Sequence, residues 1–311
     1  MPTTTANNLT LHYDEHGDAS HPPLLLVMGL GAQMTLWPME LVEALVARGF
    51  RVIRFDNRDI GLSDKFDGQK VPGVVRHILF RRFGLRPKVP YTLADMAADG
   101  AALLDSLKIE RAHVVGASMG GMIAQLMAIN HADKLHSLTS IMSTTGNPKL
   151  PQAEKPAIKA LTTPPPSMEE EALVEHGVKI ARAIGSPGYP APEDRLRTRV
   201  RNGIQRSVYP QGLPRQMAAI IDDGDRRERL KSVTTPTLVL HGEDDPLVKL
   251  EGGQDTAAAI PGATLKTFPG WGHDLPMELV DTMADAIAAH AHAAAPPVTP
   301  AAPDSAAVAA E

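Results

Sequence analysis

Short apolar runs alternate along the chain with longer segments in which apolar residues recur every three or four positions. Turn residues bound each run, as expected for strands that are buried on both faces; the runs lie at 24–28, 51–55, 113–116, 137–142, 237–241 and 264–268. Helical spacing occurs at 39–48, 92–107 and 122–129. The alternation predicts an α/β fold with a mostly parallel sheet and helices on both faces.

Three stretches depart from this alternation. Residues 9–18 alternate and then turn, which favours a hairpin at the edge of the sheet. Residues 146–232 begin with a proline-rich stretch and continue with two or three helical patterns and no clear strand, whereas strand signals resume at 237. We therefore expect a core made of 1–145 and 233–292, with 146–232 inserted as a helical cap. The final residues, 293–311, are rich in Ala and Pro and predict a disordered tail.

Composition excludes several classes of protein. The 311 residues are 43% hydrophobic and 22% charged, which is typical of a globular chain, and the formal charge of −5 gives no general attraction to nucleic acid or to an anionic membrane. The absence of cysteine excludes disulfides and thiolate metal sites. The first residues do not resemble a secretory signal, and the longest apolar run, 24–32, is too short to span a bilayer. We expect a soluble cytoplasmic protein with no nucleic-acid partner and no membrane span.

One segment is basic although the whole chain is acidic. Residues 74–91 carry five Arg and Lys side chains among apolar ones. Such a segment can hold an anionic substrate or a lipid surface, or it can be an amphipathic excursion whose side chains cover the core. The acidic balance of the chain favours the second interpretation.

The sequence GASMG, residues 116–120, lies where a predicted strand turns sharply into a predicted helix. This G-x-S-x-G pattern holds a serine in a strained turn with its hydroxyl exposed, and the two glycines keep strand and helix from colliding. The pattern alone is weak evidence, but in a strand-turn-helix context it indicates that Ser118 is a nucleophile rather than a plain turn residue.

A serine nucleophile needs a base, and the base needs an orienting acid. The run 237–241 is followed by three candidate acids, Glu243, Asp244 and Asp245, and the next run is followed by His273. The ends of neighbouring parallel strands lie together, so we expect His273 beside Ser118. His113 and His241 fall within strands and are interpreted as structural; the other histidines show no metal-ligand spacing.

Here the chain resembles the α/β-hydrolase fold superfamily over roughly 9–292. The motifs GASMG, HGEDDPLV and GWGHDLP carry the resemblance, with VMGLG and FDNRDIGLSD in support. It is most similar to the branch of capped carboxylesterases, aclacinomycin methylesterase and cofactor-free haloperoxidases. The resemblance implies eight strands with the second antiparallel, a cap after the sixth strand, and a triad of Ser118, Asp245 and His273.

Two backbone N–H groups are expected to form the oxyanion hole, those of Leu30 and Met119. Many members of the superfamily have His-Gly where this chain has Met28-Gly29, which leaves the backbone donor intact. FDNRDIGLSD resembles the family's D-x-R-G-x-G-x-S turn with Asp59 in place of a glycine, and we interpret its Asp56, Arg58 and Ser63 as bracing the loop. An apolar substrate pocket is expected from residues near the predicted site: Trp37, Met122, Met142, Trp271 and Leu275.

These residues predict a serine hydrolase that cleaves a small-molecule carboxylic ester without a cofactor or metal. The same triad also serves C–C bond hydrolases, lactone hydrolases and cofactor-free perhydrolases or haloperoxidases. A small-molecule receptor with weak turnover is a remote alternative from another class. Nucleotide binding through GASMGG is disfavoured because the P-loop lysine and the dinucleotide fingerprint are both absent.

Overall fold

The computed structural model describes residues 2–85 and 87–295. Eight strands form one sheet, with the spatial order β1-β2-β4-β3-β5-β6-β7-β8. Their bounds are Thr3–Ala6, Leu9–His16, Pro23–Val27, Arg51–Phe55, Ala112–Ala117, Leu135–Ile141, Thr237–Gly242 and Thr264–Phe268 for β1 to β8. From β4 to β8 all pairs are parallel, whereas β2 is antiparallel to both β1 and β4. The predicted mostly parallel sheet with an antiparallel second strand is confirmed.

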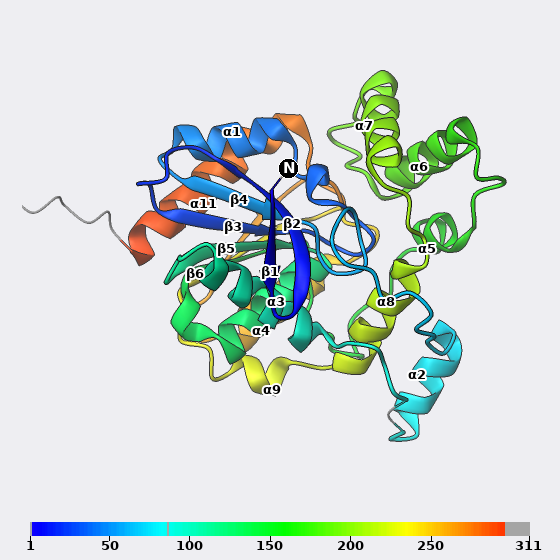
Figure 1. Ribbon diagram of the computed structural model, residues 1–311, viewed down its shortest axis with the longest axis horizontal. Helices are drawn as coiled ribbons and strands as arrows, with labels where there is room; N and C mark the ends of the chain where they lie inside the picture. The colour runs from blue at the N-terminus through cyan, green and yellow to red at the C-terminus, as the bar shows by residue number, and fades with distance from the viewer. Residues whose placement is uncertain (1, 86, 296–311) are drawn as a thin grey trace, which may run out of the picture.

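Helices cover both faces of the sheet (Figure 1). One face carries α3 (Leu93–Ser106) and α4 (Met119–Asn130), and the other carries α1 (Met39–Ala47) and α11 (Val280–Ala294). Every residue of β5 is buried, because this strand lies in the middle of the sheet between the two helical layers. A capping box begins α3, where Thr92 and Asp95 each accept a hydrogen bond from the other's backbone N–H.

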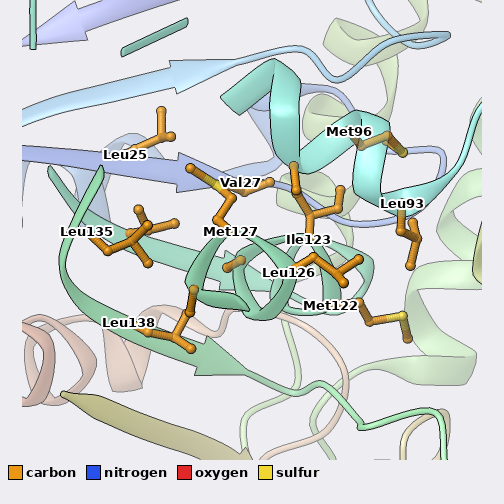
Figure 2. Packing of buried hydrophobic residues seen from close by; sticks show 14 of the residues in the cluster. Leu25, Val27, Leu93, Met96, Met122, Ile123, Leu126, Met127, Leu135 and Leu138 are labelled. Carbon is orange, nitrogen blue, oxygen red and sulfur yellow. The ribbon is translucent and has the colours of Figure 1, made fainter. Parts of the chain in front are cut away.

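Figure 2 shows how the first layer packs, with Leu25 and Val27 of β3 facing Ile123 and Met127 of α4. Buried aliphatic side chains of this kind contribute roughly 1.5–3 kcal/mol each relative to exposure. The strand-turn-helix unit β5–α4 is therefore held from both sides, which fixes the turn between them.

The hairpin at the sheet edge differs from the expected one. Residues 9–16 do not fold back on themselves; β2 pairs with β1, and Ala6 lies opposite Leu9. Asn7 and Asn8 form the two-residue turn with φ of 50° and 60°, a left-handed conformation that asparagine tolerates better than most residues. Two successive asparagines were therefore the signal for this turn.

The segment between β6 and β7 contains five helices and no strand. They are α5 (Lys155–Thr162), α6 (Glu170–Ile184), α7 (Glu193–Arg206), α8 (Gly212–Asp223) and α9 (Arg227–Leu230). Two or three were expected; α5 lies inside the proline-rich stretch, where Pro156 occupies the first turn of the helix, a position that proline tolerates.

The helices of this segment pack in two different ways. The α6–α7 pair has its own small apolar cluster of Val174, Val178 and Leu196, and Arg197 of α7 forms ion pairs with glutamates of α6. In contrast, Ala219 of α8 belongs to the large core cluster beneath the sheet. The division of the chain into core and cap stays a prediction.

The remaining helices are α2 (Val74–Arg82), α10 (Leu250–Ala259) and three short 3₁₀ turns, η1 (Met34–Leu36), η2 (Ala132–Lys134) and η3 (Met277–Leu279). The expectation that residues 74–91 cover the core is wrong for α2. This helix packs against α8 (Figure 1). It buries His77, whereas most of its apolar side chains are exposed.

Two further predictions concern the ends and the membrane. The tail was predicted to begin at residue 293, but α11 continues to Ala294. The part of the predicted tail from 296 on lies outside the described residues. Within the described chain, no helix combines the length and the apolar character that crossing a bilayer requires.

Candidate active site

Ser118 occupies the turn between β5 and α4 with φ of 56° and ψ of −122°, a strained conformation for a residue with a side chain. Steric exclusion explains why glycine occupies the positions two residues before and after Ser118. A Cβ atom on Gly116 would lie 2.1 Å from the carbonyl oxygen of Gly120, and one on Gly120 would lie 2.0 Å from that of Val27. Strand and helix thus approach too closely for any side chain at either position, as the sequence pattern predicts.

The three adjacent carboxylates after β7 point to different partners. Asp245 is buried; its Oδ1 accepts hydrogen bonds of 2.8 Å from the N–H groups of Leu247 and Val248, and its Oδ2 lies 2.7 Å from His273 Nδ1. Asp244 accepts a bond from Gly270 N at 2.7 Å, and Glu243 accepts one from Thr267. Of these carboxylates, Asp245 is the one that hydrogen-bonds His273.

His273 completes a chain of hydrogen bonds that starts at Asp245. Its Nε2 lies 3.0 Å from Ser118 Oγ, within the range expected of a nucleophile and its base. Because Nδ1 faces a carboxylate, it carries the proton, and Nε2 is left to accept the hydrogen bond from the serine hydroxyl. The three residues come from the ends of β5, β7 and β8, so the parallel sheet brings them together.

The loop that carries His273 is tied to the connection between α6 and α7. His273 N donates to Ile184 O at 2.7 Å, and Gly188 N donates to Gly270 O at 2.9 Å. Ser186 is buried; its hydroxyl accepts a 3.0 Å bond from Gly272 N and donates to Asp274. Gly272 allows the loop to approach this connection closely, since a Cβ there would lie 2.5 Å from Gly185 O.

The loop after β3 lies beside Ser118. A Cβ atom on Gly29 would be 3.1 Å from Ser118 Cβ, so Leu30 follows at the mouth of the turn. Across the described part of the chain neither Leu30 N nor Met119 N has a hydrogen-bond acceptor. Two unpaired N–H groups next to a serine hydroxyl are the arrangement that an oxyanion hole requires.

Side chains from two directions hold this loop in place. Asn57 donates to Met28 O at 2.8 Å, and Asp56 accepts from Met34 N at 2.8 Å. From α8, Gln216 accepts from Gly31 N and donates to Arg58 O, each at 2.8 Å. The predicted bracing by Asp56, Arg58 and Ser63 is present in this form, with Arg58 paired to Asp99 and Ser63 bonded to Asp56 O. Asn57 and Gln216 are further members that the sequence analysis missed.

Asp59, where the family turn has glycine, has φ of 68° and a fully buried side chain. It accepts two bonds from Arg215 of α8, at 2.7 and 2.9 Å, and one from the Tyr91 hydroxyl at 2.7 Å. Burial and this hydrogen bond raise the pKa of Tyr91 far above its usual range, while the hydrogen bonds to Asp59 raise that of Arg215. The departure from glycine thus supplies a carboxylate that fastens α8 to the core.

A cavity of about 410 Å³ opens above Ser118 and His273. Met142 and Leu275 line it, as predicted, together with Leu30. Trp37, Met122 and Trp271 were predicted to line it and do not. Their side chains turn into the two core clusters: Trp37 and Trp271 pack among the residues between the sheet and α1 and α11, and Met122 packs among those beneath α4 (Figure 2).

The outer wall of the cavity comes from α5, α6 and α7, which the sequence analysis did not connect with the site. It is apolar apart from one cation, and includes Leu161, Ile180, Ala181, Ile184 and Val200. The stripe at 177, 180, 181 and 184 has helical spacing, so this signal was present in the sequence.

Two charged residues, Arg199 of α7 and Asp274, lie in this largely apolar cavity. Burial raises the pKa of the Asp274 carboxyl, although the Ser186 hydrogen bonds and Arg199 oppose the rise. Burial lowers the pKa of the Arg199 guanidinium, and Asp274 opposes this. Arg199 has no hydrogen-bond or ion-pair partner among the described residues.

The two other histidines of interest are buried within the sheet. His113 bonds Ser137 Oγ at 2.8 Å, and burial lowers its pKa to about 3. His241 bonds Val248 O at 2.8 Å and also has a lowered pKa because it is buried. Both are neutral at pH 7 and are held by local partners, which suits a structural role.

The sheet order, the serine turn and the helices between β6 and β7 define one class of protein. The chain belongs to the alpha/beta hydrolase fold family, whose sequence pattern matches residues 22–278. It is 31% identical to a rhodomycin D methylesterase of Streptomyces peucetius over 94% of this chain and 99% of the relative. It is 28% identical to a putative non-heme bromoperoxidase of Mycobacterium tuberculosis, over 85% and 91%.

Among solved structures, the chain is similar to the enol-lactonase from Burkholderia xenovorans. The TM-score is 0.69, with 25% identity over 93% of this chain and 99% of the lactonase. The same fold thus carries ester, lactone and peroxidase names among these relatives.

Proposed function

We propose that this protein is a serine hydrolase that cleaves a carboxylic ester. The observation that carries the proposal is the continuous hydrogen-bonded chain from Asp245 through His273 to Ser118 at the floor of a cavity. Similarity to a methylesterase over nearly the whole length of both chains supports an ester as substrate. The family and the relatives agree with hydrolase activity in general; the triad mechanism is part of the proposal.

In this mechanism Ser118 Oγ attacks the ester carbonyl while its proton passes to His273 Nε2. Asp245 holds the imidazole and stabilises its positive charge. The N–H groups of Leu30 and Met119 bind the oxyanion of the tetrahedral intermediate. His273 returns the proton to the departing alcohol, which leaves the acyl group on Ser118. Water, activated by the same histidine, then releases the acid and restores the serine.

The cavity indicates the kind of ester. Its walls are largely aliphatic, so we expect the larger part of the substrate to be apolar. Binding such a substrate is favourable because it removes apolar surface from water. Arg199 is the cation of the cavity; Asp274 is a nearby charge, and no described residue forms a hydrogen bond or ion pair with Arg199. Its guanidinium suits an oxygen-rich group remote from the ester, which it can bind with more than one N–H. We propose that helices α5 to α7, within the predicted cap 146–232, close over this substrate. The cytoplasmic location stays a prediction.

The experiment that tests the mechanism uses p-nitrophenyl esters of increasing acyl length. Wild type should turn over at least one of them, and a folded Ser118→Ala variant should lose kcat by about a million-fold, because the triad acts as a unit. A fluorophosphonate should label wild type and not the variant. If Ser118→Ala retained activity within a few-fold of wild type, the serine mechanism would be wrong.

A lactone is the second candidate substrate, favoured by the 25% identity to an enol-lactonase over nearly the whole chain. It uses the same residues and differs only in that acid and alcohol stay joined. Hydrolysis of γ- and δ-lactones beside matched linear esters distinguishes the two: the preferred class has the higher kcat/KM. If neither class is cleaved while Ser118 still reacts with the fluorophosphonate, C–C bond or peracid chemistry replaces the ester proposal.

A further inference from the structure

Helix α2 turns its apolar side chains toward solvent. Val75 is 82% exposed and Phe83, which follows the helix, is 71% exposed; Val74, Ile78 and Leu79 are each about half exposed. At 100° per residue these positions fall on one side of the helix, opposite His77, which is buried against the rest of the protein. A surface helix normally buries its apolar face. In contrast, α2 lies at the edge of the molecule (Figure 1) and presents an apolar face that the described chain leaves uncovered.

The segment that carries this face is basic, and Arg81, on the helix that packs against α8, lies 3.9 Å from Asp222 of α8. Residues 68–90 include six Lys and Arg and no Asp or Glu, although the whole chain carries a formal charge of −5. The exposed cations within and beside the face are Lys70, Arg76, Arg82 and Lys88. Arg82 lies among the apolar side chains, whereas Arg76 lies at the border of the face with its guanidinium 5.0 Å from the Phe80 ring.

Apolar side chains surrounded by cations complement one surface in particular. We propose that α2 and the described residues beside it, 70–85 and 87–88, dock this protein on the surface of an anionic lipid bilayer. The apolar side chains enter the boundary between headgroups and acyl chains, and the arginines and lysines contact lipid phosphates. The helix lies in the plane of the interface and does not cross the bilayer.

A second copy of this chain is the competing occupant. In a two-fold contact of α2 with α2 the same surface meets itself, which would bring the cations of residues 68–90 together without an acidic residue of that segment between them. The separation of charge along the chain also favours lipid: the remaining residues are strongly acidic, which turns the rest of the molecule away from an anionic surface.

The test is flotation of the full chain with vesicles of phosphatidylcholine alone and of phosphatidylcholine with about one-third phosphatidylserine. We expect binding to the anionic vesicles, little binding to the neutral ones, and a loss of most binding in high salt, which screens charge beyond a few ångströms. Absence of binding to anionic vesicles, or equal binding to both kinds, overturns the proposal.

Two variants separate the two parts of the surface. Val75→Ser with Phe83→Ser removes exposed apolar area, and Arg76→Gln with Arg82→Gln removes charge; each should weaken vesicle binding by about fivefold or more. Met168→Ser, at an exposed apolar residue far along the chain, and Lys179→Gln, at an exposed cation of α6, are the matched controls and should bind as wild type does. Circular dichroism checks that each variant is folded.

The same variants identify the other occupant. If wild type is a dimer by sedimentation and does not bind vesicles, and Val75→Ser with Phe83→Ser is a monomer, then a second copy covers the face and the lipid proposal is wrong. None of these measurements depends on ester hydrolysis, so they stand or fail separately from the proposed function.

Discussion

Replacing Asp59 by glycine, the residue of the family turn, should destabilise this protein. The carboxylate is fully buried and forms a two-bonded ion pair with Arg215, which is also buried. Removing one partner of such a pair costs about 3–5 kcal/mol because the other charge stays behind without compensation. Glycine relieves about 1–2 kcal/mol of strain at a φ of 68°, and the lost bonds from Tyr91 and Phe66 N cost about as much again. The net loss is therefore about 3–5 kcal/mol.

This loss is large enough to measure by thermal unfolding. The unfolding entropy of about 2.1 cal/mol/K per residue gives about 0.65 kcal/mol/K for 311 residues. The Tm should then fall by about 5–8 °C. Asp59→Asn is the control that keeps an acceptor and a tolerance for positive φ, and it should lower the Tm less.

A double-mutant cycle tests the reason for the loss. If the cost comes from the unpaired guanidinium, then Asp59→Gly should cost much less in an Arg215→Met background than alone. Equal costs in both backgrounds, or a Tm of Asp59→Gly within a degree or two of wild type, would refute the reasoning from the buried pair.

Three further substitutions give predictions at other sites. Arg199→Met should raise KM by about tenfold or more for esters with a remote carboxylate and leave p-nitrophenyl butyrate within about twofold; equal effects on both would exclude a recognition role. Ser186→Ala removes the partner of Gly272 N and Asp274, so kcat should fall by about tenfold with KM unchanged, and a change in KM alone would contradict this positioning role. Between pH 6.5 and about 3, His113 of wild type binds a proton in the unfolded state but not in the folded state. The free energy of unfolding therefore falls as the pH falls, by up to about 1.4 kcal/mol per pH unit. His113→Gln should make urea unfolding less dependent on pH between 6 and 4, and an unchanged dependence would count against this assignment.

The sheet and the serine turn were predictable because their causes are local. A short apolar run between turn residues is buried on both faces in an α/β fold, and all six predicted runs overlap β3 to β8. The need for glycine at 116 and 120 was likewise predictable from the sequence. Neighbours close in sequence or on the adjoining strand leave no room for a side chain at either position.

The choice of acid and the pocket were less predictable because they depend on side-chain direction. Glu243, Asp244 and Asp245 are consecutive, and only the bend of the loop sends the third toward His273. Trp37 and Trp271 are next to the site in sequence, but large apolar side chains gain more by entering the core than by lining a cavity.

The contribution of helices α5 to α8 to the site depends on contacts distant in sequence. Gln216 bonds Gly31 of the loop after β3 across 185 residues, and no local pattern predicts that. Helix α2 shows a failure of a local pattern. Its apolar residues have the spacing that predicts burial against a core, but the helix turns these side chains toward solvent.

The separate packing of α6 and α7 has a consequence for protein engineering. Because the pair has its own apolar cluster and its own ion pairs, a region such as 164–207 can be exchanged with that of a relative to change which substrates fit, without rebuilding the sheet. A chimera of this kind has to keep residues 184–188, which bond the loop that carries His273. It also has to keep residues 203–207 at the end of α7, which bond Gln33, Asp56 and Gly61 of the core. Helix α8 should be left out of the exchange, because its Arg215 and Gln216 form hydrogen bonds with the turn that contains Arg58 and Asp59.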